Sequence, residues 1–200
     1  MMNTSKKEVG MLVEGKIDQA AVEKIFNCMG LVVATARGLE GKPYIEKNLR
    51  KFNQEVTITR IPLLTLVDLD KEKCAPALRK RLLPNPARQM VFRVAVREIE
   101  AWFMADRGGL SRFFQIDQEL IPSEPEKLHD PKGKLIELAK ESRSAALIRD
   151  IVPRGTGAKV GRGYVKRMLM FCEQYWRPNV AAKNSDSLSR ALKALETIVV

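Results

Sequence analysis

Acidic side chains follow three apolar runs of the sequence, and their type and spacing make them the best candidates for chemistry. These acids are Glu14 and Asp18 after the first run, Asp68 and Asp70 after the second, and Glu98 and Glu100 after the third. Carboxylate oxygens are the ligands that magnesium and manganese prefer. The only histidine is His129, and the three cysteines form no C-x-x-C pair. The residue types therefore predict a site for divalent cations rather than for zinc.

Strands and helices alternate in the first half of the chain, and this alternation positions the acids. Apolar runs predict strands at residues 9–13, 31–34, 63–67 and 90–96, and helical spacing predicts helices at 17–29, 43–52, 75–83 and 98–106. Residues 56 and 58 alternate with polar neighbours, which leaves open one strand or two before residue 67. Such alternation predicts an α/β fold with a mostly parallel sheet of about four strands flanked by helices.

The parallel sheet predicts that the acids of separate strands meet. The carboxyl ends of parallel strands lie on one edge, where ligands bind. Asp68 and Asp70 are two residues apart and share a face of an extended strand, while Gly15 allows a sharp turn that leaves Glu14 at the edge. Asp18, one helical turn onward, can face Glu14. Clustered carboxylates repel one another, so a cation is expected among them, although any single acid could instead cap a helix N-terminus.

The second half of the chain has a different character. From residue 108 onward the periodic stretches have helical spacing, and Gly, Pro and Ser separate them. We therefore expect an α/β core over residues 1–106 and a basic, mainly helical extension over residues 107–200. With 45% apolar content, 200 residues suffice for such a core without disulfides or a structural metal.

The charge balance points to a polyanionic partner. The sequence has 35 Lys and Arg against 24 Asp and Glu, a net charge of +11, which suits contact with nucleic-acid phosphates but is also compatible with a merely solvated basic surface. The candidate phosphate contacts are Arg79, Lys80, Arg81, Arg154, Lys159, Arg162, Lys166 and Arg167. Tyr164, Tyr175 and Trp176 lie among the second group and could stack on bases. Their helical spacing favours a place in the core.

The order of these motifs resembles a known family. An apolar strand, Glu14-Gly15-x-x-Asp18, and about fifty residues later an apolar strand closing in Asp68-x-Asp70 are similar to the Toprim domain, a Rossmann-like domain of topoisomerases, bacterial primases and the overcoming-lysogenization-defect (OLD) nucleases. The likeness covers residues 9–106. The stretch REIEAWFMAD at residues 97–106 is similar to the Glu-x-Trp-x-x-Ala-Asp segment of small bacterial Toprim-like proteins.

The resemblance implies roles for individual residues. It implies two Mg²⁺ or Mn²⁺ ions with the ligands Glu14, Asp18, Asp68, Asp70, Glu98 and Glu100. Glu14 would act as a metal ligand or in acid-base chemistry, and Glu100, with Glu98 less firmly matched beside it, would support the second ion. The nucleases also use a downstream lysine near the scissile phosphate, for which Lys159 and Lys166 are the candidates. Glu14, Asp68, Asp70 and Lys159 then form the expected catalytic set.

These roles imply a metal-dependent nuclease, in which two ions clamp the attacking and leaving oxygens of a phosphodiester. A topoisomerase would need a tyrosine on a separate large domain, and a primase would bring a zinc module. The alternatives are a non-catalytic nucleic-acid-binding or regulatory subunit with the same fold, and a hydrolase of nucleotides or other small phosphate esters.

The expected partners follow from the same reasoning. Nucleic acid is expected, with DNA favoured over RNA. Because the sequence has no G-x-x-x-x-G-K-[ST] motif, an ATPase such as OLD nucleases carry would be a separate polypeptide, and the pair would act in bacterial defence against phage. No signal segment or long apolar run is present, so we expect a cytoplasmic protein that does not enter a membrane. A homodimer is one of the assemblies left open.

Overall fold

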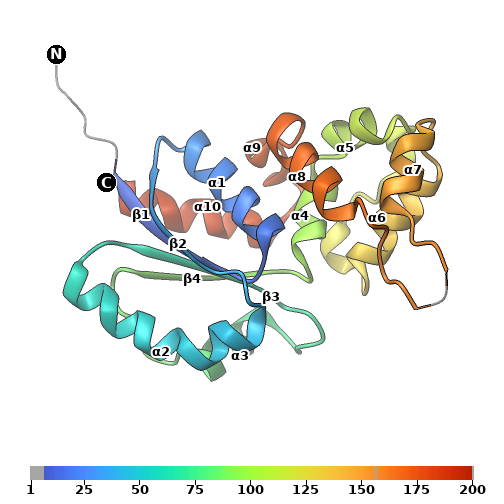
Figure 1. The fold of residues 1–200 in the computed structure, drawn as a ribbon. Helices are drawn as coiled ribbons and strands as arrows, with labels where there is room; N and C mark the ends of the chain where they lie inside the picture. The colour runs from blue at the N-terminus through green and yellow to red at the C-terminus, as the bar shows by residue number, and fades with distance from the viewer. Residues whose placement is uncertain (1–6, 156, 200) are drawn as a thin grey trace, which may run out of the picture. The chain divides into compact units, whose positions relative to one another are not determined.

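The computed structural model describes residues 7–155 and 157–199, and it divides into two compact units (Figure 1). Unit 1 is Met1–Ala95 together with Arg190–Val200, and unit 2 is Val96–Ser189. The boundary expected at residue 107 falls inside unit 2.

Unit 1 contains a four-stranded sheet whose strand pairs are all parallel. The strands are β1 (Glu8–Val13), β2 (Val32–Gly38), β3 (Leu63–Asp68) and β4 (Met90–Ala95), in the order β2-β1-β3-β4. Residues Gly10 to Leu12 of β1 pair with residues 63 to 65 of β3. The two strands that carry the first and second acidic motifs are therefore neighbours, and their carboxyl ends lie at the same edge. The predicted α/β fold with a parallel sheet of four strands is confirmed.

Burial explains why these runs are almost continuously apolar. In β1, Val9, Met11, Leu12 and Val13 are completely buried, as expected for a parallel strand covered on both faces. The edge strand β2 differs, because Val32 is 38% exposed there. Helices cover both faces of the sheet: α1 (Lys16–Cys28) lies on one face, and α2 (Lys42–Thr59) and α3 (Ala75–Leu82) lie on the other (Figure 1).

The strand-like alternation at residues 56 and 58 belongs to a helix. Val56 is 4% exposed and Ile58 is 81% exposed, because they lie on opposite sides of the last turn of α2. Arg60 ends that helix with a left-handed φ of 58°, and Pro62 precedes β3. A two-residue alternation is too short to separate a strand from two faces of a helix, so the helix extends beyond its predicted end.

Unit 2 is helical. Its elements are α4 (Ile99–Ala105), α5 (Arg107–Phe114), the 3-10 turns η1 (Gln118–Leu120) and η2 (Pro125–Lys127), α6 (Pro131–Lys140), α7 (Ala145–Ile151), α8 (Tyr164–Gln174) and α9 (Pro178–Ala181). The last helix, α10 (Asp186–Val199), begins in unit 2 and ends in unit 1. In the described residues beyond Ala95 no strand occurs, which agrees with the expected helical second half.

Aromatic side chains form much of the core of unit 2. Trp176 is 1% exposed, its indole Nε1 donates a hydrogen bond to the Trp102 carbonyl over 3.1 Å, and its ring packs edge-on against Phe103 at 5.2 Å. Tyr164 is also buried. These two aromatics therefore belong to the core, so stacking on exposed bases was the wrong alternative for them.

None of the helices described in residues 7–155 and 157–199 has the length and apolar character that a membrane crossing requires.

Candidate functional site

Glu14 links the ends of the two central strands. It follows β1 directly, and its Oε1 accepts a hydrogen bond from the backbone N–H of Asp68, over 2.9 Å, at the end of β3. The contact spans 54 residues of sequence. The parallel pairing of β1 with β3 brings these two positions together, as the shared carboxyl edge of the sheet predicts.

Asp18 acts as a helix cap. It is 8% exposed, and its Oδ2 accepts a hydrogen bond from the backbone N–H of Gly15 over 2.9 Å. A carboxylate in the first turn also interacts favourably with the helix dipole. Gly15 itself is extended, with φ of −150°, so it does not make the sharp turn expected from the sequence. A Cβ at Gly15 would instead lie 3.3 Å from Asp18 Oδ2, which leaves little room there.

Asp70 does not share the strand geometry of Asp68. The strand β3 ends at Asp68, and Asp70 adopts a left-handed φ of 53°, so the alternation of side chains along a strand does not place it. A lysine positions it instead. Lys42 Nζ lies 2.7 Å from Asp70 Oδ2 and donates to the Asp68 carbonyl over 2.6 Å. Lys42, the first residue of α2, therefore brings a positive charge to this acidic edge, and sequence reasoning missed it.

The later acids belong to unit 2, where Glu98 precedes α4 and Glu100 lies in its first turn. Glu100 is 1% exposed, and its Oε1 accepts a hydrogen bond from the Tyr164 hydroxyl over 2.8 Å. Lys132 Nζ is 3.4 Å from the same oxygen and 3.8 Å from Glu98 Oε1, and the Lys132 backbone N–H donates to Glu98 Oε2 over 3.1 Å. Lys132 was not predicted as a site residue, and Tyr164 was predicted only for base stacking or for the core, not as a partner of Glu100.

Burial changes the chemistry of this pair of acids. Desolvation raises the pKa of Glu98, and the neighbouring Glu100 raises it further, while the Lys132 charge works in the opposite direction. Among the residues that the structure describes, no hydrogen-bond partner is found for Glu100 Oε2. A buried carboxylate oxygen without a partner is costly. The position is therefore suited to an additional donor or a cation.

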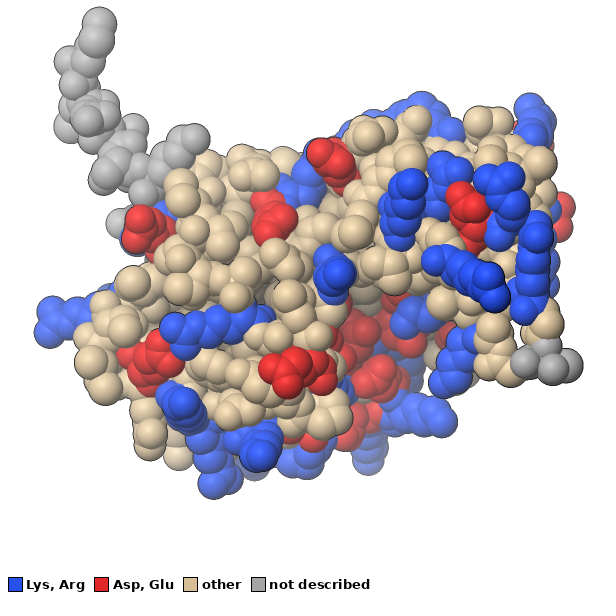
Figure 2. Space-filling model, viewed as in Figure 1, with Lys and Arg blue, Asp and Glu red and all other residues tan. Residues whose placement is uncertain are grey.

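The predicted phosphate contacts lie in different environments. Arg81 is engaged by Glu72 at 2.5 Å and by Glu46 at 3.4 Å, and Arg167 is held by Asp150 at 2.8 Å. Within residues 7–155 and 157–199, the exposed predicted contacts for which no such ion pair is found are Arg79, Lys80, Arg154, Lys159, Arg162 and Lys166. Figure 2 shows Lys and Arg gathered over α7 and the loop that follows it. Lys159 lies in that exposed loop, whereas the lysine in contact with Glu98 and Glu100 is Lys132.

The fit to a divalent cation can be judged from these contacts. The donors are carboxylate oxygens, which match a hard cation, and the partnerless oxygen of Glu100 fits this chemistry best. Over residues 7–155 and 157–199, no group of three or more His, Cys, Asp or Glu side chains is arranged to hold a metal ion. A lysine accompanies the acids in each unit, Lys42 in unit 1 and Lys132 in unit 2. The carboxylate oxygens therefore suit a divalent cation, and the lysine ammonium groups are the positive charges with which such a cation would compete.

The fold and the site define an α/β protein with carboxylates at the carboxyl edge of a parallel sheet and a helical second unit. The fold is similar to that of the C-terminal region of the Burkholderia pseudomallei OLD protein, with 16% sequence identity and a TM-score of 0.51. The match covers 98% of this chain and 100% of that chain. It supports an OLD-related fold. No protein-family model matches the sequence, and no curated protein matches it either.

Proposed function

We propose that this protein is a metal-dependent nuclease that hydrolyses phosphodiester bonds of nucleic acid. The observation that carries the proposal is the 2.9 Å hydrogen bond from the Asp68 backbone N–H to Glu14 Oε1. It joins two acidic motifs, far apart in sequence, at the sheet edge where α/β proteins bind ligands. The similarity in fold to the OLD C-terminal region supports the same proposal.

The acids of both units take part in this proposal. Glu14, Asp68 and Asp70 in unit 1, and Glu98 and Glu100 in unit 2, would hold Mg²⁺ or Mn²⁺, whereas Asp18 serves mainly to fix the start of α1. When bound, the cations would supply Lewis-acid stabilisation of the charge that develops on phosphate oxygens. The carboxylates of this chain would hold the ions and orient them toward the substrate.

A lysine beside the carboxylates would stabilise the developing negative charge of the transition state. The resemblance to the OLD nucleases offers Lys159 and Lys166 for this role, with Lys159 in the expected catalytic set. Lys132 has the stronger structural support, because it already lies 3.4 Å from Glu100 Oε1 and 3.8 Å from Glu98 Oε1. We therefore propose Lys132 as the first lysine to test, with Lys159 as the second.

The proposed partners are nucleic acid, with DNA favoured, and a separately encoded ATPase, with a role in defence against phage. The net charge of +11 supports the nucleic acid. The absence of a G-x-x-x-x-G-K-[ST] motif from the 200 residues is compatible with an ATPase on another chain. Co-purification from the native host tests the ATPase, and its repeated absence would contradict this part of the proposal.

A non-catalytic nucleic-acid-binding subunit is the second candidate. It is favoured by Lys42, whose ammonium group contacts Asp70 Oδ2 at 2.7 Å and lets the acidic edge be stable without a divalent ion. In that case the acids would be structural, and only the basic surface would bind nucleic acid.

Cleavage assays with Asp68→Ala separate the two candidates. Plasmid DNA and RNA are incubated with wild type, with Asp68→Ala and with the control Asp117→Ala, whose side chain is 78% exposed. We expect cleavage by wild type and the control in Mg²⁺ or Mn²⁺, and none by Asp68→Ala, which should still bind DNA. Equal cleavage by Asp68→Ala would remove the nuclease proposal. Manganese calorimetry that shows no binding by wild type would favour the non-catalytic subunit.

A further inference from the structure

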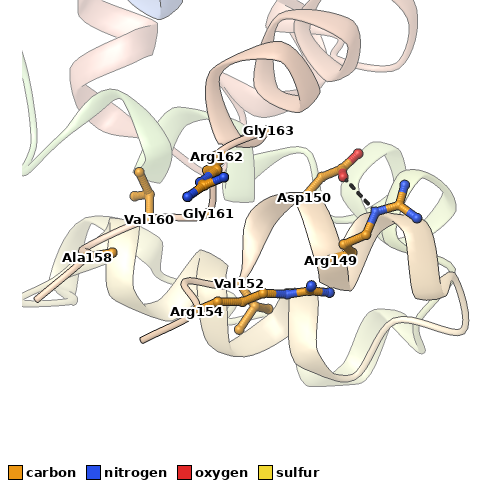
Figure 3. Close-up of a pocket in the computed structure, with 9 residues that line it drawn as sticks. All are labelled: Arg149, Asp150, Val152, Arg154, Ala158, Val160, Gly161, Arg162 and Gly163. Carbon is orange, nitrogen blue, oxygen red and sulfur yellow. Dashed lines mark hydrogen bonds and ion pairs between the residues drawn. The ribbon is translucent and has the colours of Figure 1, made fainter. Parts of the chain in front are cut away.

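Unit 2 contains a hollow of about 550 Å³ between the end of α7 and the loop that leads into α8 (Figure 3). Three arginines line it: Arg149, Arg154 and Arg162. Among the described residues that line it, Asp150 is the only acid, and the apolar side chains Val152, Ala158 and Val160 form much of the wall. The volume lies within the range of small-molecule sites, roughly 300 to 1,000 Å³, so it exceeds what a single inorganic anion needs.

Two glycines fix the wall of this hollow. The backbone N–H of Gly161 donates to the Ile151 carbonyl over 2.8 Å, and that of Gly163 donates to the Asp150 carbonyl over 2.9 Å. A Cβ at Gly161 would lie 2.4 Å from the Asp150 carbonyl oxygen, and one at Gly163 would lie 2.6 Å from Asp150 Cβ. Only glycine permits so close an approach. The Gly-Arg-Gly sequence thereby docks the loop on α7 and places Arg162 in the wall of the hollow.

The charges of the hollow are not balanced. Asp150 is already engaged, because Arg167 contacts its Oδ2 at 2.8 Å and Arg149 contacts its Oδ1 at 3.3 Å. Arg154 and Arg162 are exposed, and no ion pair to either is found within the described part of the chain. Two guanidinium groups of the lining, those of Arg154 and Arg162, are therefore available to a ligand in this open hollow, and each can donate paired hydrogen bonds to a phosphate.

We propose that this hollow binds the phosphate monoester of a nucleotide, with Arg154 and Arg162 as its principal ligands. A phosphate monoester carries about 1.5 to 2 negative charges at neutral pH, which matches two arginines better than the single charge of a backbone diester. The remaining volume and the apolar wall accommodate the attached nucleoside. The source is either a free nucleotide or the terminal phosphate of a nucleic-acid strand. The binding needs none of the acidic residues of the proposed function.

Titrations in EDTA test this binding independently of any cleavage. The full chain is titrated at fixed salt with AMP, with adenosine, and with a short single-stranded oligonucleotide that carries or lacks a 5′-phosphate. The variant Arg154→Gln/Arg162→Gln is compared with Lys47→Gln/Arg50→Gln, a control on the exposed surface of α2 that changes the net charge equally. Circular dichroism confirms that both variants fold.

We expect AMP to bind more tightly than adenosine, and the arginine variant to lose about 100-fold in AMP affinity, roughly tenfold for each charged hydrogen-bonding partner removed. The control should bind as wild type does. Tighter binding of the 5′-phosphorylated oligonucleotide than of AMP would identify the strand end as the source, and the reverse order would identify a free nucleotide. Equal binding of AMP and adenosine, no AMP binding by wild type, or an equal loss in the control variant would overturn the proposal.

Discussion

Removing Arg177 should destabilise the protein strongly, and neutralising its partner Asp106 should then restore part of the loss. Asp106 is completely buried at the junction of α4 and α5. Arg177 donates to it from Nε over 2.9 Å and from Nη2 over 2.6 Å. The backbone N–H groups of Gly109 and Arg177 each donate to it over 2.9 Å. Its hydrogen bond with Arg177 raises the pKa of that guanidinium.

The magnitudes follow from the burial of the carboxylate. Breaking a buried pair by removing one partner costs about 3–5 kcal/mol, because the other charge stays uncompensated. Arg177→Ala should fall near the lower end of that range, about 3 kcal/mol, because Asp106 is 0% exposed whereas the Arg177 side chain is 45% exposed and its removal admits water. In wild type, Asp106→Asn should cost about 1–3 kcal/mol, because its amide N–H groups would face N–H donors. In the Arg177→Ala background the same change removes a buried charge and should recover about 1–2 kcal/mol.

Urea unfolding followed by far-UV circular dichroism measures the four proteins of this cycle. Arg143→Ala is the control, because Arg143 and its partner Asp117 are 76% and 78% exposed and 3.7 Å apart, and it should cost less than about 1 kcal/mol. The decisive comparison is Arg177→Ala with the double variant. A double variant less stable than Arg177→Ala alone would refute the reasoning, because the buried charge would then not be the source of the cost.

Three further predictions concern the acidic clusters. Lys42→Met removes the ammonium group that contacts Asp70, so MnCl₂ should raise the Tm of this variant more than it raises the Tm of wild type. Equal shifts of Tm in scanning fluorimetry would contradict a competition between the lysine and the metal. Burial raises the pKa of Glu98, so its carboxyl group binds a proton more tightly in the folded state than in the unfolded state. The stability of wild type should therefore fall relative to that of Glu98→Gln as pH rises through and above the ordinary carboxyl range. Urea midpoints that stay parallel with pH would exclude this linkage. Tyr164→Phe removes the 2.8 Å donor to buried Glu100 and should cost about 1–3 kcal/mol in the same urea assay, whereas an unchanged midpoint would show that this bond adds nothing to stability.

The strands and most helices could be predicted because their signals are local. The fully buried run of β1 is apolar at nearly every position, and the spacing of Ala21 and Ile25 marks the buried face of α1. Gly30 follows α1 with a left-handed φ of 70°, as a residue after a helix commonly does. The hydrophobic pattern was misleading at Val56 and Ile58, because three residues are too few to distinguish the two-residue period of a strand from the roughly 3.6-residue period of a helix.

The candidate site was only partly predictable, because its contacts are not local. The alternation of strands and helices predicts that the acids lie at one edge of a parallel sheet, and the pairing of β1 with β3, which the sequence does not predict, then places Glu14 beside the end of β3. The lysine contacts do not follow from it. Lys42 reaches Asp70 across 28 residues, and Lys132 is 34 residues from Glu98. No periodicity of the sequence specifies which lysine contacts which acid.

Lys42 changes what the acidic edge implies. Carboxylates brought together by strand order repel one another, and on the sequence alone a divalent cation was the expected remedy. The ammonium group of Lys42 already contacts Asp70 Oδ2 and the Asp68 carbonyl, so the edge carries its own positive charge. Under the metal-dependent proposal, a divalent ion would compete with this lysine, and several carboxylates would have to bind the ion together. Manganese affinity should consequently depend on Glu14 and Asp68 as well as on Asp70, which a lone surface ion pair would not require.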